Sequence, residues 1–287
     1  MTDVAAVVVN YNTRDHLLAC LRSLRADGVI QVVVVDNASV DGSGEALRQD
    51  DPGAVLLAMT ANLGYGTAAN RGVTVADAGY VLILNPDAVI EPGTIKVLAE
   101  ALDRNPGLAV VGPRMEEVDG SLYPSARCFP NLVDAAGHAF LGLALPSNRY
   151  TRRYRMLDRD HSVPGEADWV SGACLLVRRS AFQAVGGFDE SYFMYAEDVD
   201  LCWRLRREGW RIGYEPGARV THSLGASSQQ APYRMILAHH RSLLRFASST
   251  TTGRRRWLLP VVAAGLAVRT VMAWTHHALE RSRPVAQ

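Results

Sequence analysis

The chain has 287 residues, enough to bury a large core, and α/β proteins of this size often form one domain. Hydrophobic residues make up 48% and charged residues 21%, with a net charge of +1, which excludes a disordered chain and does not indicate nucleic-acid binding. The four cysteines form no CxxC pair, which argues against a zinc site or a disulfide framework and fits a reducing cytosol. The N-terminal stretch lacks the basic and long apolar regions of a secretory signal, so we expect a protein that is not exported.

Short apolar runs alternate with helical stretches in the first part of the chain. The runs at residues 4–9, 32–35, 54–59 and 80–84 each predict a fully buried strand. Residues 13–25, with four leucines on one face, and residues 66–78 predict helices between them. This β-α-β-α order predicts an open, Rossmann-like, mostly parallel sheet.

Polar residues follow each of these strands. They are Asn10, Asp36, Asn62 and the trio Asn85-Pro86-Asp87. Because ligands of open α/β sheets bind outside the carboxyl ends of the strands, we expect a binding site along this edge.

The alternation weakens after Val111. The stretch "GPRMEEVDGSLYPSARCFPN" predicts a turn-rich segment, and "NRYTRRYR" (residues 148–155) predicts a basic loop. Because charge runs are usually solvated, a surface loop is favoured over an anion site for the latter.

Two carboxylates at strand ends have both a structural and a chemical interpretation. Asp36, in "VVVVDNASVDGS", precedes an Asx-type turn, and it could instead accept a proton from a base N–H or a ribose hydroxyl. Asp87, in "LILNPDAVIEP", stands where a carboxylate can hold Mg²⁺ or Mn²⁺ against a diphosphate. Asn-Pro-Asp is also an ordinary turn, so the motif alone is weak.

The stretch "NLGYGTAANRG" supports a rival hypothesis. Gly64, Gly66 and Ala69 match a GxGxxA dinucleotide fingerprint, and Asp87 follows at about the expected ~20 residues, which would make the protein a dinucleotide-dependent oxidoreductase. The match lies in a later βα unit, however, and the oxidoreductase hypothesis assigns no role to His222 or to the Glu197-Asp198 cluster.

Acidic residues follow closely on aromatic ones in "GGFDESYFMYAEDVDLCWRLRREGW". Glu197, Asp198 and Asp200 could simply open a helix that closes with three arginines, as the helix dipole favours. Behind an aromatic wall, partial desolvation would also raise the pKa of a carboxylate and make it a better base. His222, in "ARVTHSLGASS", is by itself more often a structural residue than a ligand, although its polar loop could reach a site.

Taken in order, "VVVNYN", "VVVVDNASVDGS", "NLGYGTAANRG", "LILNPDA", the acidic stretch and "VTHSLGASS" resemble the GT-A glycosyltransferases of family 2 over about residues 4–244. Within that family, "GSLYPSARCFPNL" and "FDESYFMYAEDVDL" are similar to the actinobacterial rhamnosyltransferases of the cell-wall linker. The resemblance implies a metal-dependent, inverting transfer of L-rhamnose from dTDP-rhamnose to polyprenyl-diphosphate-linked N-acetylglucosamine. A family 2 glycosyltransferase that uses another nucleotide sugar remains an alternative, as does a sugar-nucleotide-binding protein without catalysis.

The resemblance also implies roles for individual residues. Asp198 would be the catalytic base, supported by Glu197, and Asp87 and His222 would hold the metal ion, Mg²⁺ or Mn²⁺. Asn85 stands where many family members have a first aspartate, which lowers the charge of that metal site. Trp169 and Tyr195 would contact the acceptor. The residues expected at the nucleotide sugar are Asn10, Asp36, Asn62, Gly64, Asn70, Arg71 and Asn85.

The C-terminal stretch is basic and apolar. Residues 253–284 open with three arginines, and their apolar run at 257–268 is interrupted by Arg269, which makes it too short and too charged to span a bilayer. We expect a helix in an anionic membrane surface, with a helix packed on the domain as the alternative. The protein would then be cytoplasmic and peripheral on the inner face of the cell membrane. We accordingly divide the chain into a domain at 1–250, with nucleotide-binding (1–112) and acceptor (113–250) halves, and a membrane-associating tail at 251–287.

Overall fold

The computed structural model describes residues 3–130, 145, 148–223 and 231–281. The strands, in chain order, are β1 (Val4–Asn10), β2 (Gln31–Asp36), β3 (Val55–Ala58), β4 (Tyr80–Leu84), β5 (Ala88–Ile90), β6 (Leu108–Glu116), β7 (Leu122–Tyr123), β8 (Ala126–Arg127), β9 (Gly165–Ala167), β10 (Trp169–Val170), β11 (Cys174–Arg178) and β12 (Arg211–His222). The helices are α1 (Arg14–Ala26), α2 (Ser43–Asp50), α3 (Tyr65–Val75), α4 (Thr94–Arg104), α6 (Arg149–Tyr154), α7 (Arg179–Ala184), α8 (Glu197–Arg207), α9 (Pro232–Thr250), the 3-10 helix η2 (Gly253–Leu258) and α10 (Leu259–Arg281).

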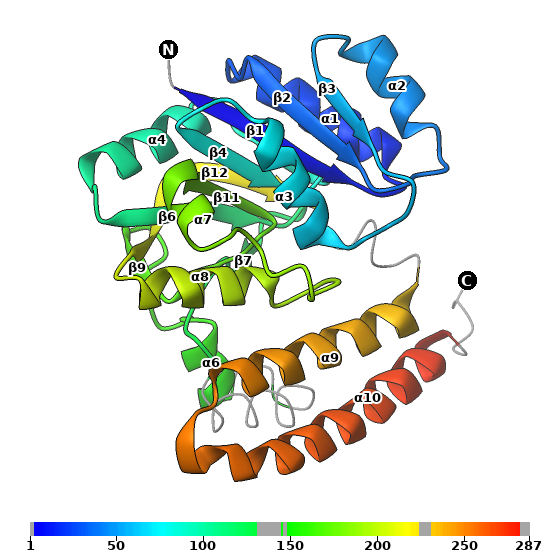
Figure 1. Ribbon diagram of the computed structural model, residues 1–287, viewed down its shortest axis with the longest axis vertical. Coiled ribbons are helices and arrows are strands. Elements are labelled where there is room, and N and C mark those ends of the chain that lie inside the picture. Colours follow the sequence, from blue (N-terminus) through cyan, green and yellow to red (C-terminus); the bar gives the residue numbers. More distant parts are fainter. Residues whose placement is uncertain (1–2, 131–144, 146–147, 224–230, 282–287) are drawn as a thin grey trace.

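A single large sheet, in the order β3-β2-β1-β4-β11-β6-β12-β5, runs through the upper part of the molecule (Figure 1). The four strands β3, β2, β1 and β4 are parallel, as predicted, whereas β11 pairs antiparallel with both β4 and β6. In the β1–β2 register Asn10 lies beside Asp36, so the carboxyl ends of these strands meet as expected. The predicted α/β sheet is therefore confirmed, and its second half is mixed.

One predicted strand is less buried than expected. β3 forms the edge of the sheet, and Val55 is 40% exposed. Its apolar run does not distinguish an edge strand from a central one, because only the pairing decides which strand lies at the edge.

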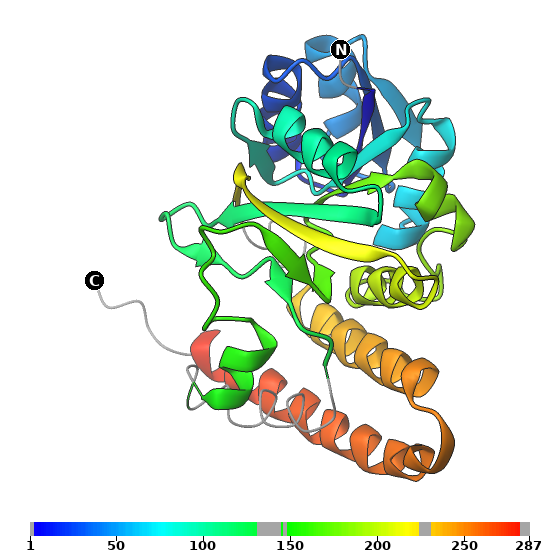
Figure 2. The same ribbon diagram turned by 90° about the vertical axis from the view of Figure 1, so that its left-hand side faces the viewer.

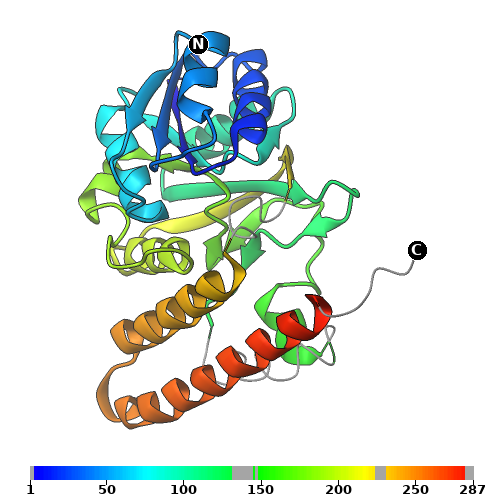
Figure 3. The same cartoon turned by 90° about the vertical axis from the view of Figure 1, so that its right-hand side faces the viewer.

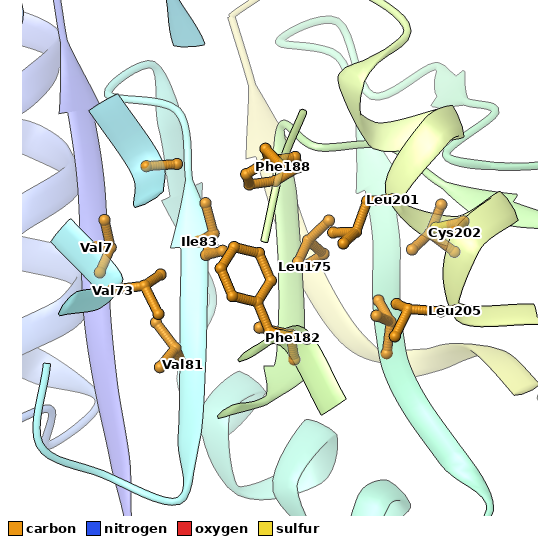
Figure 4. Close-up of a cluster of buried hydrophobic side chains, with 14 of the residues drawn as sticks. Val7, Val73, Val81, Ile83, Leu175, Phe182, Phe188, Leu201, Cys202 and Leu205 are labelled. Atoms are coloured by element: carbon orange, nitrogen blue, oxygen red, sulfur yellow. The ribbon is translucent and has the colours of Figure 1, made fainter. Parts of the chain in front are cut away.

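Helices cover both faces of the sheet. Leucines of α1 and α4 pack against one face, and α3, α7 and α8 cover the other. Figure 4 shows the second of these layers, where Leu201, Cys202 and Leu205 of α8 pack in the same core as Leu175 of β11 and Ile83 of β4. This packing anchors the helix that begins with Glu197 and Asp198 on the sheet.

One prediction for the second half of the chain holds only in part, and one is wrong. The segment predicted to be rich in turns begins inside β6, which continues to Glu116 because β12 pairs with it, and turns and two short strands follow only after that residue. The basic segment at 148–155 is not a loop, because Arg149–Tyr154 form helix α6 and the Asn148 side chain caps it by accepting hydrogen bonds from the backbone N–H groups of Tyr150 and Thr151. The proposed boundary at residue 112 lies within β6, so the two proposed halves share one sheet.

Helices α9 and α10 form a hairpin below the sheet, and Figures 1, 2 and 3 all show them side by side. The Thr270 hydroxyl lies 3.0 Å from Nδ1 of His240, and the Trp274 indole N–H donates to the Tyr233 carbonyl oxygen. One side of α10 therefore packs on α9, the arrangement we had given as the alternative for the tail. The helix continues through Arg269 without a break.

The outer side of the hairpin remains apolar and exposed. Its exposed side chains include Trp257, which is 70% exposed, and Val261, Val268, Val271 and Met272. Gly253–Ala278 contains an 18-residue window with a mean hydropathy of 1.6, and the segment is long and apolar enough to cross a membrane by length and composition alone. The expectation that this stretch is too short to span a bilayer is therefore corrected, because the helix does not end at Arg269.

Candidate active site

A cavity of about 660 Å³ lies at the carboxyl edge of the sheet, where α9 also lines it. Most of the predicted site residues line this cavity, namely Asn62, Gly64, Asn85, Asp87, Trp169, Tyr195, Glu197, Asp198 and His222. They come from strand ends and loops that are far apart in the chain. The structure thus brings together residues from both proposed halves.

Asn10 and Asp36 are not among the residues that line the cavity, although their chain neighbours Val9, Tyr11 and Asn37 are. The Asn10 amide donates to Oδ1 of Asp36 at 2.8 Å, and the Ser39 backbone N–H donates to Oδ2. Asn10 therefore holds Asp36 in place, which differs from the pocket-lining role predicted for it.

The neighbouring Asn37 lines the cavity and was missed in the sequence. Its amide donates to Oδ1 of Asn62 at 2.9 Å and to the Gly64 carbonyl oxygen, and its own Oδ1 accepts from the Leu63 backbone N–H. Its position directly after Asp36, at the end of a buried strand, was the available signal. Tyr11, after β1, also lines the cavity and was missed.

The loop before α3 requires glycine at position 64. Gly64 has a φ of +92°, and a Cβ atom there would collide with the Phe193 carbonyl oxygen. The backbone N–H of Tyr65 donates to that same oxygen at 3.0 Å. This close approach joins the α3 loop to the loop that precedes Glu197.

Asn70 and Arg71, predicted at the nucleotide sugar, are not among the residues that line the cavity. The Asn70 side chain donates to the Phe188 carbonyl oxygen and accepts from the Phe188 backbone N–H. It therefore fastens the turn after the double glycine. Arg71 is exposed on α3. A polar residue in a helix can face either way, and its sequence position alone does not decide which.

Asp87 and His222 form a buried pair at one end of the cavity. Oδ1 of Asp87 lies 3.1 Å from Nε2 of His222, because β5 pairs antiparallel with the end of β12. The Asn85 amide lies 3.4 Å from the same ring nitrogen, and the Tyr123 ring packs edge-on against the imidazole. Nδ1 of His222 is buried and has no hydrogen-bond partner among the described residues. The loop after Ser223, quoted with the His222 motif, lies outside the described residues.

This pair fits a divalent cation only together with a ligand. The described residues contain no group of three His, Cys, Asp or Glu side chains suited to a metal ion. Mg²⁺ is typically held by one or two carboxylates, with substrate phosphate oxygens completing its shell. The Asp87 carboxylate and the His222 imidazole line the cavity and match such an incomplete set of protein ligands.

The acid pair follows a strained backbone. Tyr195 and Ala196 both have left-handed conformations, with φ of 68° and 63°, and α8 begins at Glu197. Glu197 and Asp198 open a helix that ends with arginines, and they also line the cavity. Strained non-glycine residues are concentrated at functional sites.

Asp198 is held by the backbone and is half-buried. Its Oδ2 accepts a hydrogen bond of 2.9 Å from the Gly172 N–H, and its Oδ1 accepts one from the Val199 N–H. Burial raises the pKa of this carboxyl, while the two N–H groups and the charge of Arg127 oppose the rise. A carboxylate with a raised pKa is suited to accept a proton near neutral pH.

Glu197 is more deeply buried, and its Oε2 has no hydrogen-bond partner among the described residues. Burial, followed by the nearby charge of Asp198, raises the pKa of Glu197 well above the ordinary range of a glutamate. The two neighbouring acids therefore occupy different environments.

Arg127 is a further cavity residue that was missed. Its guanidinium lies 5.0 Å from the Trp169 ring centroid, within reach of the Tyr123 and Tyr154 rings, and donates to the Tyr123 hydroxyl at 3.0 Å. It forms no ion pair among the described residues, although its charge acts on Asp198. Its motif, "GSLYPSARCFPNL", was noted for the whole stretch and not for this residue.

Models of known families match most of the chain. The model of glycosyl transferase family 2 matches residues 5–186, and that of glycosyl transferase family group 2 matches residues 131–281. Over 99% of its length, the chain is 42% identical to the N-acetylglucosaminyl-diphospho-decaprenol L-rhamnosyltransferase of Mycobacterium tuberculosis, and 96% of that protein is covered. It is 27% identical to rhamnosyltransferase WbbL of Escherichia coli, over 85% of this chain and 92% of that protein.

Solved structures agree on the fold. GalNAc-T7, solved with UDP, GalNAc and Mn²⁺, aligns with a TM-score of 0.61 at 13% identity, over 86% of this chain and 48% of that one. The mannosyltransferase PcManGT from Pyrobaculum calidifontis was solved with GDP-Man and Mn²⁺. It aligns with a TM-score of 0.57 at 19% identity, over 98% of this chain and 81% of that one. The predicted GT-A fold is confirmed, and the dinucleotide oxidoreductase hypothesis is not supported. The chain belongs to glycosyl transferase family 2.

Proposed function

We propose that this glycosyltransferase transfers L-rhamnose from dTDP-L-rhamnose to N-acetylglucosaminyl-diphospho-polyprenol, with inversion at the anomeric carbon, in the synthesis of a cell-wall linker. The observation that carries the proposal is the 42% identity, over nearly the whole chain, to a protein named for rhamnosyl transfer to that class of acceptor. The shared cavity of the Glu197-Asp198 pair and the Asp87-His222 pair supports it.

Asp198 is the proposed general base. The acceptor hydroxyl gives its proton to the Asp198 carboxylate while its oxygen attacks the anomeric carbon and the bond from that carbon to the nucleoside diphosphate breaks. A single displacement of this kind inverts the configuration. The backbone N–H of Gly172 keeps the carboxylate oriented, since Gly172 has no side chain to crowd Asp198. Trp169 and Tyr195 line the same cavity and are the proposed acceptor contacts.

Asp87 and His222 are the proposed ligands of a divalent cation, Mg²⁺ or Mn²⁺. Such an ion would offset the negative charge of the leaving diphosphate when bound. Asn85 lies beside His222 and is proposed to contact the diphosphate. Asp36, which the Asn10 amide holds by a hydrogen bond, is proposed to bind the nucleoside base, and Asn62 and Gly64 line the cavity.

The proposed location is the cytoplasmic face of the cell membrane, because a polyprenyl-linked acceptor is confined to the bilayer. The exposed apolar side of α10 and the exposed residues Arg254, Arg255 and Arg256 suit an anionic membrane surface. Surface docking would raise the rate at which the cavity meets its acceptor.

The test is a donor screen with the purified protein. A short-chain polyprenyl-diphosphate-N-acetylglucosamine is incubated with dTDP-rhamnose, other nucleotide sugars and Mn²⁺ or Mg²⁺, and products are identified by mass spectrometry. We expect a mass gain of one deoxyhexose only with dTDP-rhamnose. A product formed with another donor would still show a glycosyltransferase, but it would overturn the assignment of rhamnose as the transferred sugar. The absence of turnover, despite stabilisation by a nucleoside diphosphate and Mn²⁺, would indicate the binding-protein alternative.

A further inference from the structure

Helix α9 carries a row of arginines beside the active-site cavity. Arg234, Arg241 and Arg245 are spaced seven and four residues apart, which places them on one face of the helix. Together they line a second cavity of about 460 Å³. None of the described residues that line this cavity is an aspartate or glutamate, and Ser191 and Ser242 add hydroxyl groups.

The second cavity borders the first. Phe193 and Arg234 line both cavities, and the Arg234 guanidinium lies 5.7 Å from the centroid of the Phe193 ring. The two cavities therefore share part of one wall, which this side-chain pair forms.

Helix α9 is also fastened to the loop before the acid pair. The Ser242 hydroxyl donates to the Met194 carbonyl oxygen at 2.8 Å, and the His239 ring packs edge-on against Tyr195 at 5.0 Å. Arg245 forms an ion pair of 3.1 Å with Asp189. These contacts hold the arginine row at a constant position relative to Asp198.

The charge of this row is largely unneutralised. Arg245 is paired with Asp189, but neither Arg234 nor Arg241 forms an ion pair with any described residue. An exposed arginine row is ordinarily a solvated surface. This one differs because it lines a cavity that has no acid among its described lining residues and shares Phe193 and Arg234 with the active-site cavity. Arginine forks bind phosphate oxygens in pairs of hydrogen bonds.

We propose that the arginine row of α9 binds the diphosphate of the lipid-linked acceptor and so presents the acceptor sugar to Asp198. This inference rests on the proposed function. The acceptor diphosphate is attached to the sugar that is to be modified, so a site for it must lie near the base yet apart from the donor diphosphate. Asp87 and His222, proposed for the donor, line the first cavity but not the second. Binding energy from this remote group would orient the reacting hydroxyl.

The test compares two acceptors in the full-length protein. One is a short-chain polyprenyl diphosphate of N-acetylglucosamine, and the other is a neutral glycoside of the same sugar with the same alkyl chain. Arg241→Gln is the cleanest variant, because Arg241 has no ion pair among the described residues. We expect the ratio of kcat/KM between the diphosphate and the neutral acceptor to fall about tenfold, the loss of one charge-assisted contact. Arg48→Gln, an exposed arginine of α2 at the far end of the molecule (Figure 1), is the matched control and leaves the ratio unchanged.

An unchanged ratio in Arg241→Gln, and likewise in Arg234→Gln, would overturn the proposal. Vesicles of phosphatidylglycerol test the other source of lipid phosphate. If the variants bind these vesicles less tightly while the ratio stays constant, the row binds headgroups and not the acceptor. Should the wild-type protein transfer no sugar, the proposed function fails, and calorimetry with farnesyl diphosphate still tests the site. Binding by the wild type that weakens about tenfold in Arg241→Gln would support it, and equal or absent binding would refute it.

Discussion

The carboxyl edge of the sheet and the α9–α10 hairpin differ in how far their polar and apolar side chains are buried. At the sheet edge, polar side chains are buried and bonded to one another, as Asn10 is to Asp36 and Asn37 is to Asn62. In the hairpin, arginines and large apolar side chains such as Trp257 are exposed. A buried, bonded group is held in one geometry, whereas an exposed group remains available to a partner.

This contrast predicts two kinds of response to mutation. Changes at the sheet edge and the acid pair should affect the chemical step strongly, because preorganised groups act there. Changes in the hairpin should alter binding of the acceptor or of the membrane and leave donor binding intact. The variants below test this division, from the largest expected effect to the smallest.

Asp198→Asn should lower kcat on the order of 10² to 10⁴-fold, because the amide cannot accept the proton of the acceptor hydroxyl. The dissociation constant of the donor should stay near that of the wild type, as measured by calorimetry. Asp200→Asn is the control, since Asp200 lies on the same helix, pairs with Arg204 at 2.7 Å and does not line the cavity. Near-normal turnover by Asp198→Asn would refute the base assignment.

Asp87→Ala and His222→Ala should each lower kcat by about 10²-fold, because a preorganised stabiliser of the leaving diphosphate is lost. EDTA should reproduce the effect in the wild type. Binding of Mn²⁺ in the presence of nucleoside diphosphate, followed by electron paramagnetic resonance, should weaken in both variants. Full activity in chelator would contradict a metal role and would make Arg127 the leading candidate for the counter-charge.

Replacing Arg254, Arg255 and Arg256 by glutamine should weaken sedimentation with anionic liposomes, by on the order of 1 kcal/mol for each charge. Donor binding should not change. Deletion of residues 253–287 should release the protein further, and a thermal shift with the donor nucleotide reports whether the domain stays folded. Equal liposome binding by all three proteins, or unfolding of the truncated one, would show that the tail is structural.

Arg127→Met should move the acidic limb of the pH profile of kcat/KM to higher pH. The charge of Arg127 lowers the pKa of Asp198, so its removal raises that pKa, and the base is then ionised only at higher pH. The loss of activity should therefore be greater at low pH than at high pH. Arg127→Lys keeps the charge and should keep the limb near its original position. If the acidic limb does not move in Arg127→Met, the charge of Arg127 does not affect the pKa of the catalytic base.

Glu197→Gln should have the smallest effect on turnover and should stabilise the fold by about 1 to 3 kcal/mol at alkaline pH. Burial raises the pKa of Glu197, so the native state binds a proton more tightly than the unfolded state does. The free energy of unfolding of the wild-type protein should then fall as the pH rises above about 4.3, the ordinary pKa of a glutamate. The fall should end once the pH exceeds the raised pKa of Glu197. The gain in Tm of the variant should grow over that range. A greater loss of turnover than in Asp198→Asn would instead make Glu197 the base.

The sequence by itself determined the elements whose pattern is local. The apolar runs of β1, β2 and β4, with polar residues directly after them, predicted the parallel strands and the edge at which Asp36 and Asp87 lie. Acids at the start and arginines at the end of residues 197–207 predicted α8, because the helix dipole acts within a single helix. The ordered motifs also indicated family 2 before any geometry was known.

Only the tertiary structure decided which side chains share the cavity. Arg127 has no periodic signal, and its aromatic neighbours Tyr154 and Trp169 lie far along the chain. Asn70 was expected at the nucleotide but bonds to Phe188, because helix orientation depends on packing against the sheet. The composition of the tail is compatible with a helix on a membrane, a helix across a membrane or a helix packed on the domain. Its contacts with His240 and Tyr233 show that it forms a hairpin with α9. Such contacts join distant segments, so local propensity carries no information about them.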